Sequence, residues 1–288
     1  MTRIKKIIAY ALFVSGAAVL FLYVLFPSDT VKTYIEYKLA GISPDTEVHI
    51  EKVQPGIPPR LSATNVYVSF RDDTAVRLDR VDWMPDYLSL ISSRPGADFT
   101  ASVAGGRLNG TVHVNDSPEN RSIITRMQFA DIELQAIPLL VTFYPGGFSG
   151  TAQGNIEYSA SMNNSGQNAA NGSAVVEIHG ARITIENNLP GLDDLTFSRI
   201  NADADLQNNR ITINQIDMEG SQFSATGKGS LTVAPRLETS RMDLNGTVQI
   251  HPELIRSVGP LLPRQYLKDG KVSLRITGTV TRPRYSFR

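Results

Sequence analysis

From Pro44 to the C-terminus, apolar residues recur at every second position in many short stretches. This period of two is typical of strands that bury one face, because successive side chains of a strand point to opposite sides. Clear examples are Val66-x-Val68-x-Phe70, Ile156-x-Tyr158-x-Ala160-x-Met162 and Val272-x-Leu274-x-Ile276. The pattern predicts about fourteen short strands, with no long helical patterns between them. A parallel α/β fold is therefore not expected.

Turn signals separate the predicted strands, since Asn-Gly and similar pairs supply the positive φ that tight hairpins need. They are Gly105-Gly106, Asn109-Gly110, Asn187-Asn188, Asn208-Asn209, Asn245-Gly246 and Asp269-Gly270. Three short helices are expected at Pro85–Ser92, Ala136–Phe143 and Pro252–Leu262. The polar stretch 163–173 is interpreted as an exposed loop that could subdivide the domain. The expected fold is mainly β, with a large curved antiparallel sheet or a sandwich-like domain over residues 44–288.

The N-terminal part has a different pattern. Residues 7–26 carry no charge, and a helix of that length would be about 30 Å long, the thickness of the hydrocarbon core of a bilayer. The basic tail 1–6 precedes this run, so the positive-inside rule predicts a cytoplasmic N-terminus. A membrane-proximal helix is expected within 27–43, over residues 28–40, where apolar residues fall near one face.

A cleaved signal peptide is the alternative interpretation of this opening run. Such a peptide has an apolar region of about 7–15 residues followed by a site of small residues. Here Gly16-Ala17-Ala18 lies in the middle of the run, and Phe26-Pro27-Ser28 closes it. The pattern favours an uncleaved single-pass anchor, with the bulk of the chain outside the cytoplasm.

Composition narrows the classes of function. The 28 basic and 28 acidic residues balance, so a nucleic-acid partner is not expected. Without residues 1–26 the chain keeps 25 basic and 28 acidic residues, a net charge of −3. The chain has no cysteine, which excludes disulfides and thiolate chemistry.

Candidate chemistry is sparse. The four histidines, His49, His113, His179 and His251, each stand alone in strand-like stretches, without the spacing of a metal site. The nucleophile-elbow, Walker A and dinucleotide-binding motifs are absent from the sequence. We therefore expect no catalytic residue, no cofactor and no metal, and hence no enzyme.

A loose repeat places small and large apolar residues on one strand face. It occurs as Gly150-x-Ala152-x-Gly154-x-Ile156, Ala225-x-Gly227-x-Gly229-x-Leu231 and Leu274-x-Ile276-x-Gly278-x-Val280. Small residues let a sheet curve or let another group approach the backbone, whether a helix, a second sheet or an acyl chain. Seven inward positions are candidates for facing either lipid or a closed core: Ile156, Tyr158, Ile178, Ile211, Phe223, Ile250 and Ile276.

Several segments together resemble the type II secretion system protein N family. They are the anchor ending in Phe26-Pro27, the stretch Leu61 to Phe70, Val76-Arg77-Leu78-Asp79, Leu88-Ser89-Leu90-Ile91, Ala101 to Gly110, and Ile276-Thr277-Gly278-Thr279-Val280-Thr281-Arg282-Pro283. The layout is also similar to the broader AsmA-like periplasmic β-proteins, which share the paired glycines and the closing I-x-G-T-x-x-x-P.

The resemblance implies a function without catalytic residues. It implies an inner-membrane accessory component of the type II protein secretion system of a Gram-negative cell, with the bulk of the chain in the periplasm. Its partners would then be other secretion-system subunits in the inner membrane and periplasm, with membrane lipid around residues 7–26. The AsmA-like relatives imply the alternative, a lipid-binding or lipid-transfer protein with an apolar groove.

Overall fold

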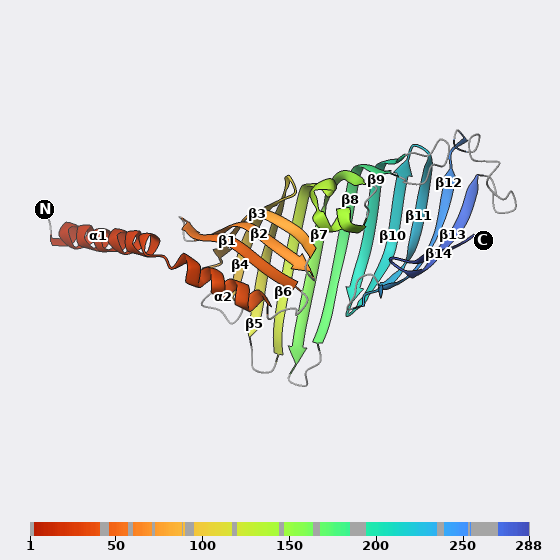
Figure 1. Ribbon diagram of the computed structural model, residues 1–288. Helices are drawn as coiled ribbons and strands as arrows, with labels where there is room; N and C mark the ends of the chain where they lie inside the picture. The colour runs from red at the N-terminus through yellow and green to blue at the C-terminus, as the bar shows by residue number, and fades with distance from the viewer. Residues whose placement is uncertain are drawn as a thin grey trace.

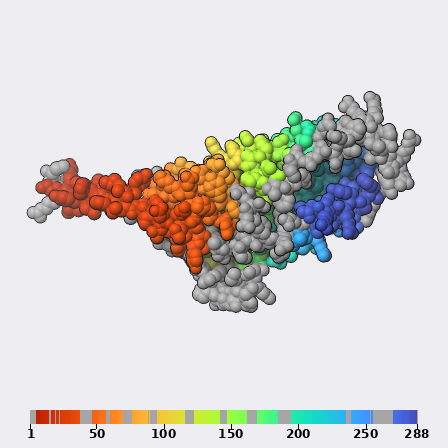
Figure 2. Space-filling view, viewed as in Figure 1, coloured from red at the N-terminus to blue at the C-terminus, as the bar shows by residue number. Residues whose placement is uncertain are grey.

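The architecture is that of a computed structural model of the whole chain. It describes residues 3–40, 46–56, 60–70, 73–87, 89, 95–116, 120–143, 147–163, 168–184, 194–234, 239–252, 254 and 270–287. The molecule is elongated, with α1 (Arg3–Val24) projecting from one end and the C-terminal strands at the other (Figures 1 and 2).

Fourteen strands form one sheet, and each strand pairs only with its neighbours in sequence. Every pairing is antiparallel. The strands are β1 (Thr46–Gly56), β2 (Arg60–Phe70), β3 (Asp73–Pro85), β4 (Gly96–Val103), β5 (Gly106–Asp116), β6 (Asn120–Glu133), β7 (Phe148–Asn163), β8 (Asn168–Thr184), β9 (Asp194–Gln207), β10 (Arg210–Gly220), β11 (Phe223–Thr232), β12 (Arg241–Ile250), β13 (Lys271–Thr279) and β14 (Pro283–Phe287).

The expected antiparallel sheet of fourteen strands is confirmed, as a single sheet rather than a sandwich. The strands are longer than predicted, reaching 17 residues in β8. The predicted loop 163–173 is wrong over 168–173, because β8 begins at Asn168 and pairs with β7 from Met162 onward. Ala170 and Gly172 occupy alternate positions at the start of this strand. They are too small to be recognised in the sequence as part of an apolar period of two.

The turn predicted at Asn208-Asn209 is confirmed as a two-residue hairpin loop between β9 and β10, with a φ of 56° at Asn208. The turn predicted at Gly105-Gly106 lies one residue earlier, at Ala104-Gly105, where both residues have positive φ and Gly106 begins β5. Asn109-Gly110 and Asn245-Gly246 instead lie inside β5 and β12. A Cβ at Gly110 would lie 2.5 Å from the Phe99 ring, so this glycine makes room for a cross-strand side chain.

The helices lie mainly at the N-terminal end. The helix expected over 28–40 is present as α2 (Ser28–Ala40), which contacts β1. A short helical segment, η2 (Leu134–Ala136) and α3 (Pro138–Phe143), corresponds to the piece expected at 136–143. Two other short helices were expected, at 85–92 and 252–262. Pro85 is the last residue of β3, and most of the other residues of both segments lie outside the described chain.

The run 7–26 is helical over α1 as far as Val24. Searching the described residues yields no helix with both the length and the apolar character needed to cross a membrane.

The sheet curls around α3. This helix contacts β3, although it lies between β6 and β7 in the chain. In a flat sheet β3 and β7 would be about 19 Å apart, whereas a helix with its side chains is about 10–12 Å wide. The sheet therefore bends toward the side that carries α3, and Figure 1 shows β1–β3 in front of β4–β6.

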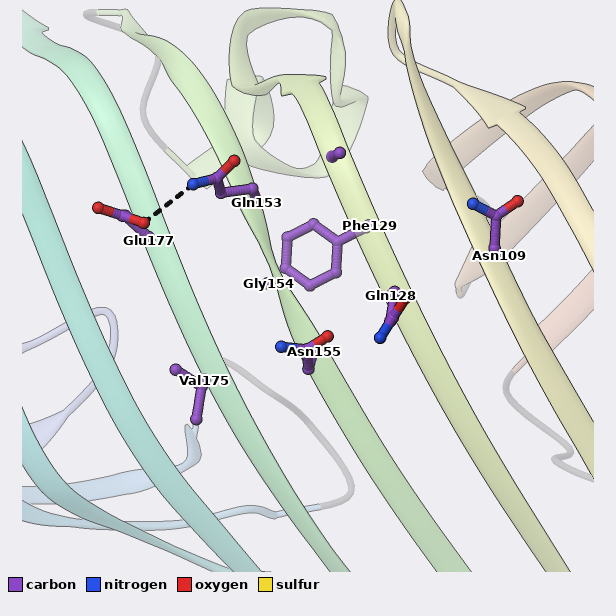
Figure 3. A pocket seen from close by; sticks show the side chains of 9 residues that line it. Asn109, Gln128, Phe129, Gln153, Gly154, Asn155, Val175 and Glu177 are labelled. Atoms are coloured by element: carbon purple, nitrogen blue, oxygen red, sulfur yellow. Dashed lines mark hydrogen bonds between the residues drawn. The ribbon is translucent and has the colours of Figure 1, made fainter.

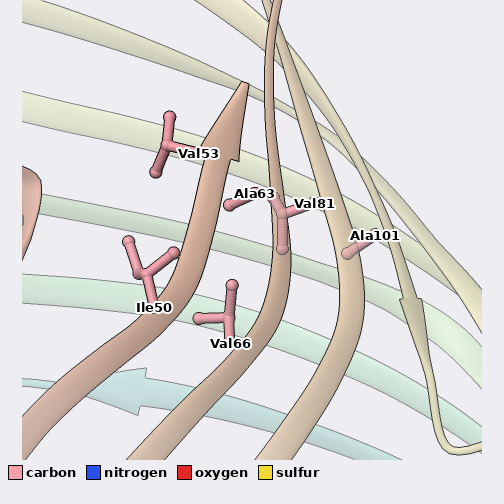
Figure 4. Packing of buried hydrophobic residues seen from close by; sticks show 6 residues of the cluster. All are labelled: Ile50, Val53, Ala63, Val66, Val81 and Ala101. Carbon is pink, nitrogen blue, oxygen red and sulfur yellow. The ribbon is translucent and has the colours of Figure 1, made fainter. Parts of the chain in front are cut away.

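The best-packed core lies under α2. Ile50, Val53, Ala63, Val66, Val81 and Ala101 are each at most 4% exposed and cluster on one face of β1–β4 (Figure 4). Val31 and Ile35 of α2 pack against this cluster. A second cluster, around Ile132 and Leu134, joins α3 to the sheet.

Truncation of this core should destabilise the sheet. Ile50 is fully buried, so Ile50→Ala removes three methylene or methyl groups and leaves a cavity. We expect the free energy of unfolding, measured by denaturant titration, to fall by about 2–5 kcal/mol. The matched control is Ile124→Ala on β6, where the side chain is 43% exposed and a loss below about 1 kcal/mol is expected. Equal losses for both variants would contradict this placement of the core.

Candidate functional site

The register of the sheet aligns apolar residues into rows that run across the strands. Residues that pair directly in an antiparallel sheet point to the same face. Following the pairs from β1 to β14 gives a first central row: Val53, Ala63, Val81, Ala101, Leu108, Phe129, Gly154, Val176, Ala202, Ile216, Gly227, Gly246, Leu274 and Phe287.

A second central row lies on the same face, two residues away from the first on each strand, or three residues away in β10, where a bulge intervenes. It consists of Pro55, Leu61, Trp83, Phe99, Gly110, Met127, Ile156, Ala174, Ala204, Ile213, Gly229, Leu244, Ile276 and Tyr285. Neither row contains a charged or amide side chain at any of the fourteen strands. The sheet therefore carries an unbroken apolar band along its whole length, which we call the trough.

The trough is a long and narrow apolar band on one face of the sheet. Thirteen strand spacings of about 4.8 Å give a length of about 62 Å. One flanking row on either side of the central rows widens the apolar band to about 20 Å, at about 6.8 Å per pair of residues. Because the sheet bends toward α3, which packs on this face, the trough is the inner side of the curl.

Among the described residues, helices cover the trough mainly at one end of the sheet. Over β1–β6 it is covered by α2, η2 and α3, which pack on the buried clusters. Over β8–β13 the helical residue Leu254 packs on Ile250 and Val272 at one flank, and the central-row side chains are partly exposed. The total accessible area is 19207 Å², against about 12,000 Å² for a compact protein of this mass.

The seven sequence-predicted positions all lie on the trough face. Ile156 and Ile276 belong to the second central row, and Tyr158 joins Ile211 in one flanking row through Gly172 and Leu206. Ile178, Phe223 and Ile250 lie on the opposite flank.

Packing divides these seven residues into two groups. Ile178, Phe223 and Ile250 pack with buried clusters, and the Phe223 ring meets Phe197 edge-on at 5.4 Å between centroids. Ile156, Tyr158, Ile211 and Ile276 belong to none of the buried clusters found among the described residues. Their assignment as lipid-facing stays a prediction.

The sequence identified only part of the trough. The loose repeat already placed Gly227 and Gly229 of β11 on one strand face, but Ala174, Ala202, Ala204 and Gly246 were not identified as part of the floor. The signal of these residues is only the alternation of small residues with polar ones, which does not distinguish a buried strand face from a loop. The cross-strand rows themselves need the register, which the sequence does not specify.

The opposite face of the sheet is polar and internally paired. Glu177 accepts hydrogen bonds from Gln153 (2.9 Å) and Arg199 (2.6 Å), and these bonds lower the pKa of its carboxyl (Figure 3). Asp243 and Arg275 form a bidentate pair at 2.9 and 2.7 Å. Such cross-strand pairs stabilise a solvated face and need no ligand.

A depression of about 420 Å³ on this polar face is lined mainly by amide side chains. The amides include Asn109, Gln128 and Asn155, and Figure 3 shows the Phe129 ring beside Gly154, both of which belong to the first central row. Searching the part of the chain that the structure describes gives no group of three or more His, Asp or Glu able to hold a metal ion. The trough is therefore the better candidate site.

Comparison with known proteins gives no relative: no protein-family model, no curated protein and no solved structure matches the chain.

A charge placed in the trough should weaken its affinity for apolar molecules. Ile213 and Thr212 are neighbours on β10 that point to opposite faces. We expect Ile213→Lys to reduce the binding of an apolar fluorescent dye about tenfold, because the dye would have to desolvate an unpaired ammonium group. Thr212→Lys, beside Asp205 on the polar face, should leave dye binding unchanged. A similar loss in both variants would show that the dye does not use the trough.

Proposed function

We propose that this chain is a membrane-anchored lipid-binding protein of the cell envelope, whose trough shields acyl chains from water. The observation that carries the proposal is the pair of central rows, which cross all fourteen strands without one charged side chain. A protein in water gains nothing from leaving the stretch of this band over β8–β13 partly exposed unless an apolar partner covers it.

The dimensions of the trough suit hydrocarbon chains. One leaflet of a bilayer holds acyl chains about 15 Å deep, half of its hydrocarbon core. From β8 to β14, beyond the part that the helices cover, the trough spans six strand spacings, about 29 Å, so an acyl chain about 15 Å long fits along it with room for a second. The lining offers few polar partners, so the ligand's polar headgroup would stay at the rim, in water.

The glycines of the floor make room for neighbouring apolar side chains. In β11 and β12 the central rows consist of Gly227, Gly229, Gly246 and Leu244. A Cβ at Gly227 would lie 3.2 Å from the Ile216 side chain, and one at Gly229 would lie 2.9 Å from the Leu244 side chain. These isoleucine and leucine side chains therefore form the apolar surface here, flanked by Met218, Leu231 and Met242.

We place α1 in the inner membrane of a Gram-negative cell, with a cytoplasmic N-terminus and the sheet in the periplasm. This part of the proposal rests on the uncharged run 7–26 and on the exposure of α1. Apolar side chains point outward around its circumference, including Ile7, Tyr10, Leu12 and Phe13, each at least 67% exposed. A helix that is apolar all round needs an apolar medium.

Lipid bound in the trough should be directly detectable. We expect phospholipid to co-purify with the full chain in mild detergent, and a photo-crosslinking residue at position 276 to capture it. The matched control places the same group at position 277, since Thr277 pairs with Asp243 on the polar face while Ile276 pairs with Leu244 in the trough. Mass spectrometry then identifies the adduct.

Adducts confined to position 276 would support the proposal. Equal labelling at 276 and 277 would mean that lipid only coats the protein, and the absence of lipid at both positions would overturn it.

A second candidate is the function implied by the resemblance, an accessory subunit of the type II protein secretion system acting through protein–protein contacts. The observation that favours it is the single sheet of sequential hairpins, an arrangement whose edge strands can bind a partner by strand addition.

Deleting the gene tests this candidate. We expect release of a normally secreted enzyme into the medium to fall, with recovery when the intact gene is supplied in trans. Unchanged secretion in the deletion strain would count against a secretion role and would leave the lipid proposal standing.

A further inference from the structure

Three arginines share one cross-strand row at the rim of the sheet where β9 joins β10 and β13 joins β14. Arg210 begins β10, Arg241 begins β12 and Arg282 directly precedes β14, and we call these three residues the basic rim. Consecutive arginines are two strand spacings, about 9.6 Å, apart. The pairs from β8 to β13 give the row Asn171, Gln207, Arg210, Thr232, Arg241 and Thr279, and Thr279 exchanges backbone hydrogen bonds with Arg282.

The charge of the basic rim is not neutralised within the described chain. All three arginines are exposed, none forms an ion pair with another described residue, and their row contains no acidic residue. Asp205 and Asp243 lie on the same face, two residues further from the rim. Both are already engaged, since Asp205 accepts a hydrogen bond of 2.8 Å from Asn214 and Asp243 forms the bidentate pair with Arg275.

The opposite rim of the same strands has a different character. The corresponding row there is His179, Arg199, Glu219, Ser224, Gln249 and Lys271. This row contains an acidic residue, and its arginine, Arg199, is bonded to Glu177 at 2.6 Å. Unpaired positive charge is therefore concentrated on one side of the trough, and a ligand with one charged end would bind in one orientation.

The basic rim adjoins the trough directly. Ile211, Met242 and Pro283 each follow one of its arginines in the chain, and all three belong to one flanking row of the trough. At two of the three positions, only the two-residue loops 208–209 and 280–281 lie beyond the arginine. Near the ends of strands, side chains of both faces border the same rim. A ligand in the trough can therefore place a polar end against these guanidinium groups.

Arginine is the side chain best suited to a phosphate group. Its planar guanidinium donates two parallel hydrogen bonds to phosphate oxygens, and it keeps its charge at any physiological pH. A headgroup with net negative charge would gain from all three arginines. A zwitterionic headgroup carries an ammonium group beside its phosphate, and the same arginines would repel that group.

We propose that the basic rim binds the phosphate of an anionic phospholipid whose acyl chains lie in the trough. Arg210, Arg241 and Arg282 thereby select the headgroup and fix which side of the trough it occupies. This inference rests on the lipid proposal and adds the class of lipid and its orientation.

The test measures binding of two phospholipids by the full chain in non-ionic detergent. Phosphatidylglycerol and phosphatidylethanolamine carry the same fluorescent acyl chain, so that they differ only in the headgroup. We expect phosphatidylglycerol to bind about tenfold more tightly, and about 0.5 M salt to remove most of this preference by screening. In the triple variant Arg210→Gln, Arg241→Gln, Arg282→Gln, the two lipids should bind equally, with the affinity for phosphatidylethanolamine unchanged.

The matched control removes three positive charges elsewhere on the sheet, in the variant Lys52→Gln, Arg107→Gln, Lys271→Gln. These residues are exposed, and none lies in the row of the basic rim. The control should keep the preference for phosphatidylglycerol. Glycerol phosphate, which has the phosphate but no acyl chain, should not displace the lipid.

Four results would overturn the inference while leaving the lipid proposal standing. They are equal binding of the two lipids by the unaltered chain, a preference that survives about 0.5 M salt or the triple variant, an equal loss of preference in the control, and displacement by glycerol phosphate, which would assign the arginines to free phosphate. Binding of neither lipid by the unaltered chain would instead remove the lipid proposal, and this inference with it.

Discussion

Cross-strand alignment of apolar residues on one face of a single sheet is the constraint on which the rest of the structure depends. A strand has two faces, and a one-residue slip would move every side chain to the other face. Here thirteen successive pairings keep the same face apolar, through bulges such as that between Ile213 and Gln215. The fold thereby separates an apolar side from a polar side over the whole length of the molecule.

That separation explains why the two halves of the sheet differ. In the first half, α2 and α3 cover the apolar side, and residues such as Ile50 and Val81 become a conventional buried core. This half fixes the curvature, because α3 contacts β3 and the adjoining η2 contacts β7. In the second half the central rows on the same side are partly exposed, while flanking residues such as Ile200 and Val272 form two further buried clusters. The buried clusters supply stability, and the central rows of the second half supply the surface available to a ligand.

Much of this could be predicted from alternation alone. Period-two patterns identified the strand-rich fold, and Ile156, Ile211 and Ile276 fall on one face as their spacing predicts. The choice between one sheet and a sandwich could not be predicted, because both give the same alternation. Gly110 and Gly246 were misinterpreted as turn residues, because the cross-strand crowding that requires a glycine there appears only in three dimensions.

The central claim is that acyl chains lie along the trough. Paramagnetic relaxation tests it most directly, with a phospholipid that carries a nitroxide on its acyl chain and methyl-labelled protein in detergent. The account predicts strong broadening of the methyl signals of Ile156, Ile213 and Ile276, and little at Thr212 and Thr277 on the polar face. Equal broadening on both faces, or none on either, would contradict it.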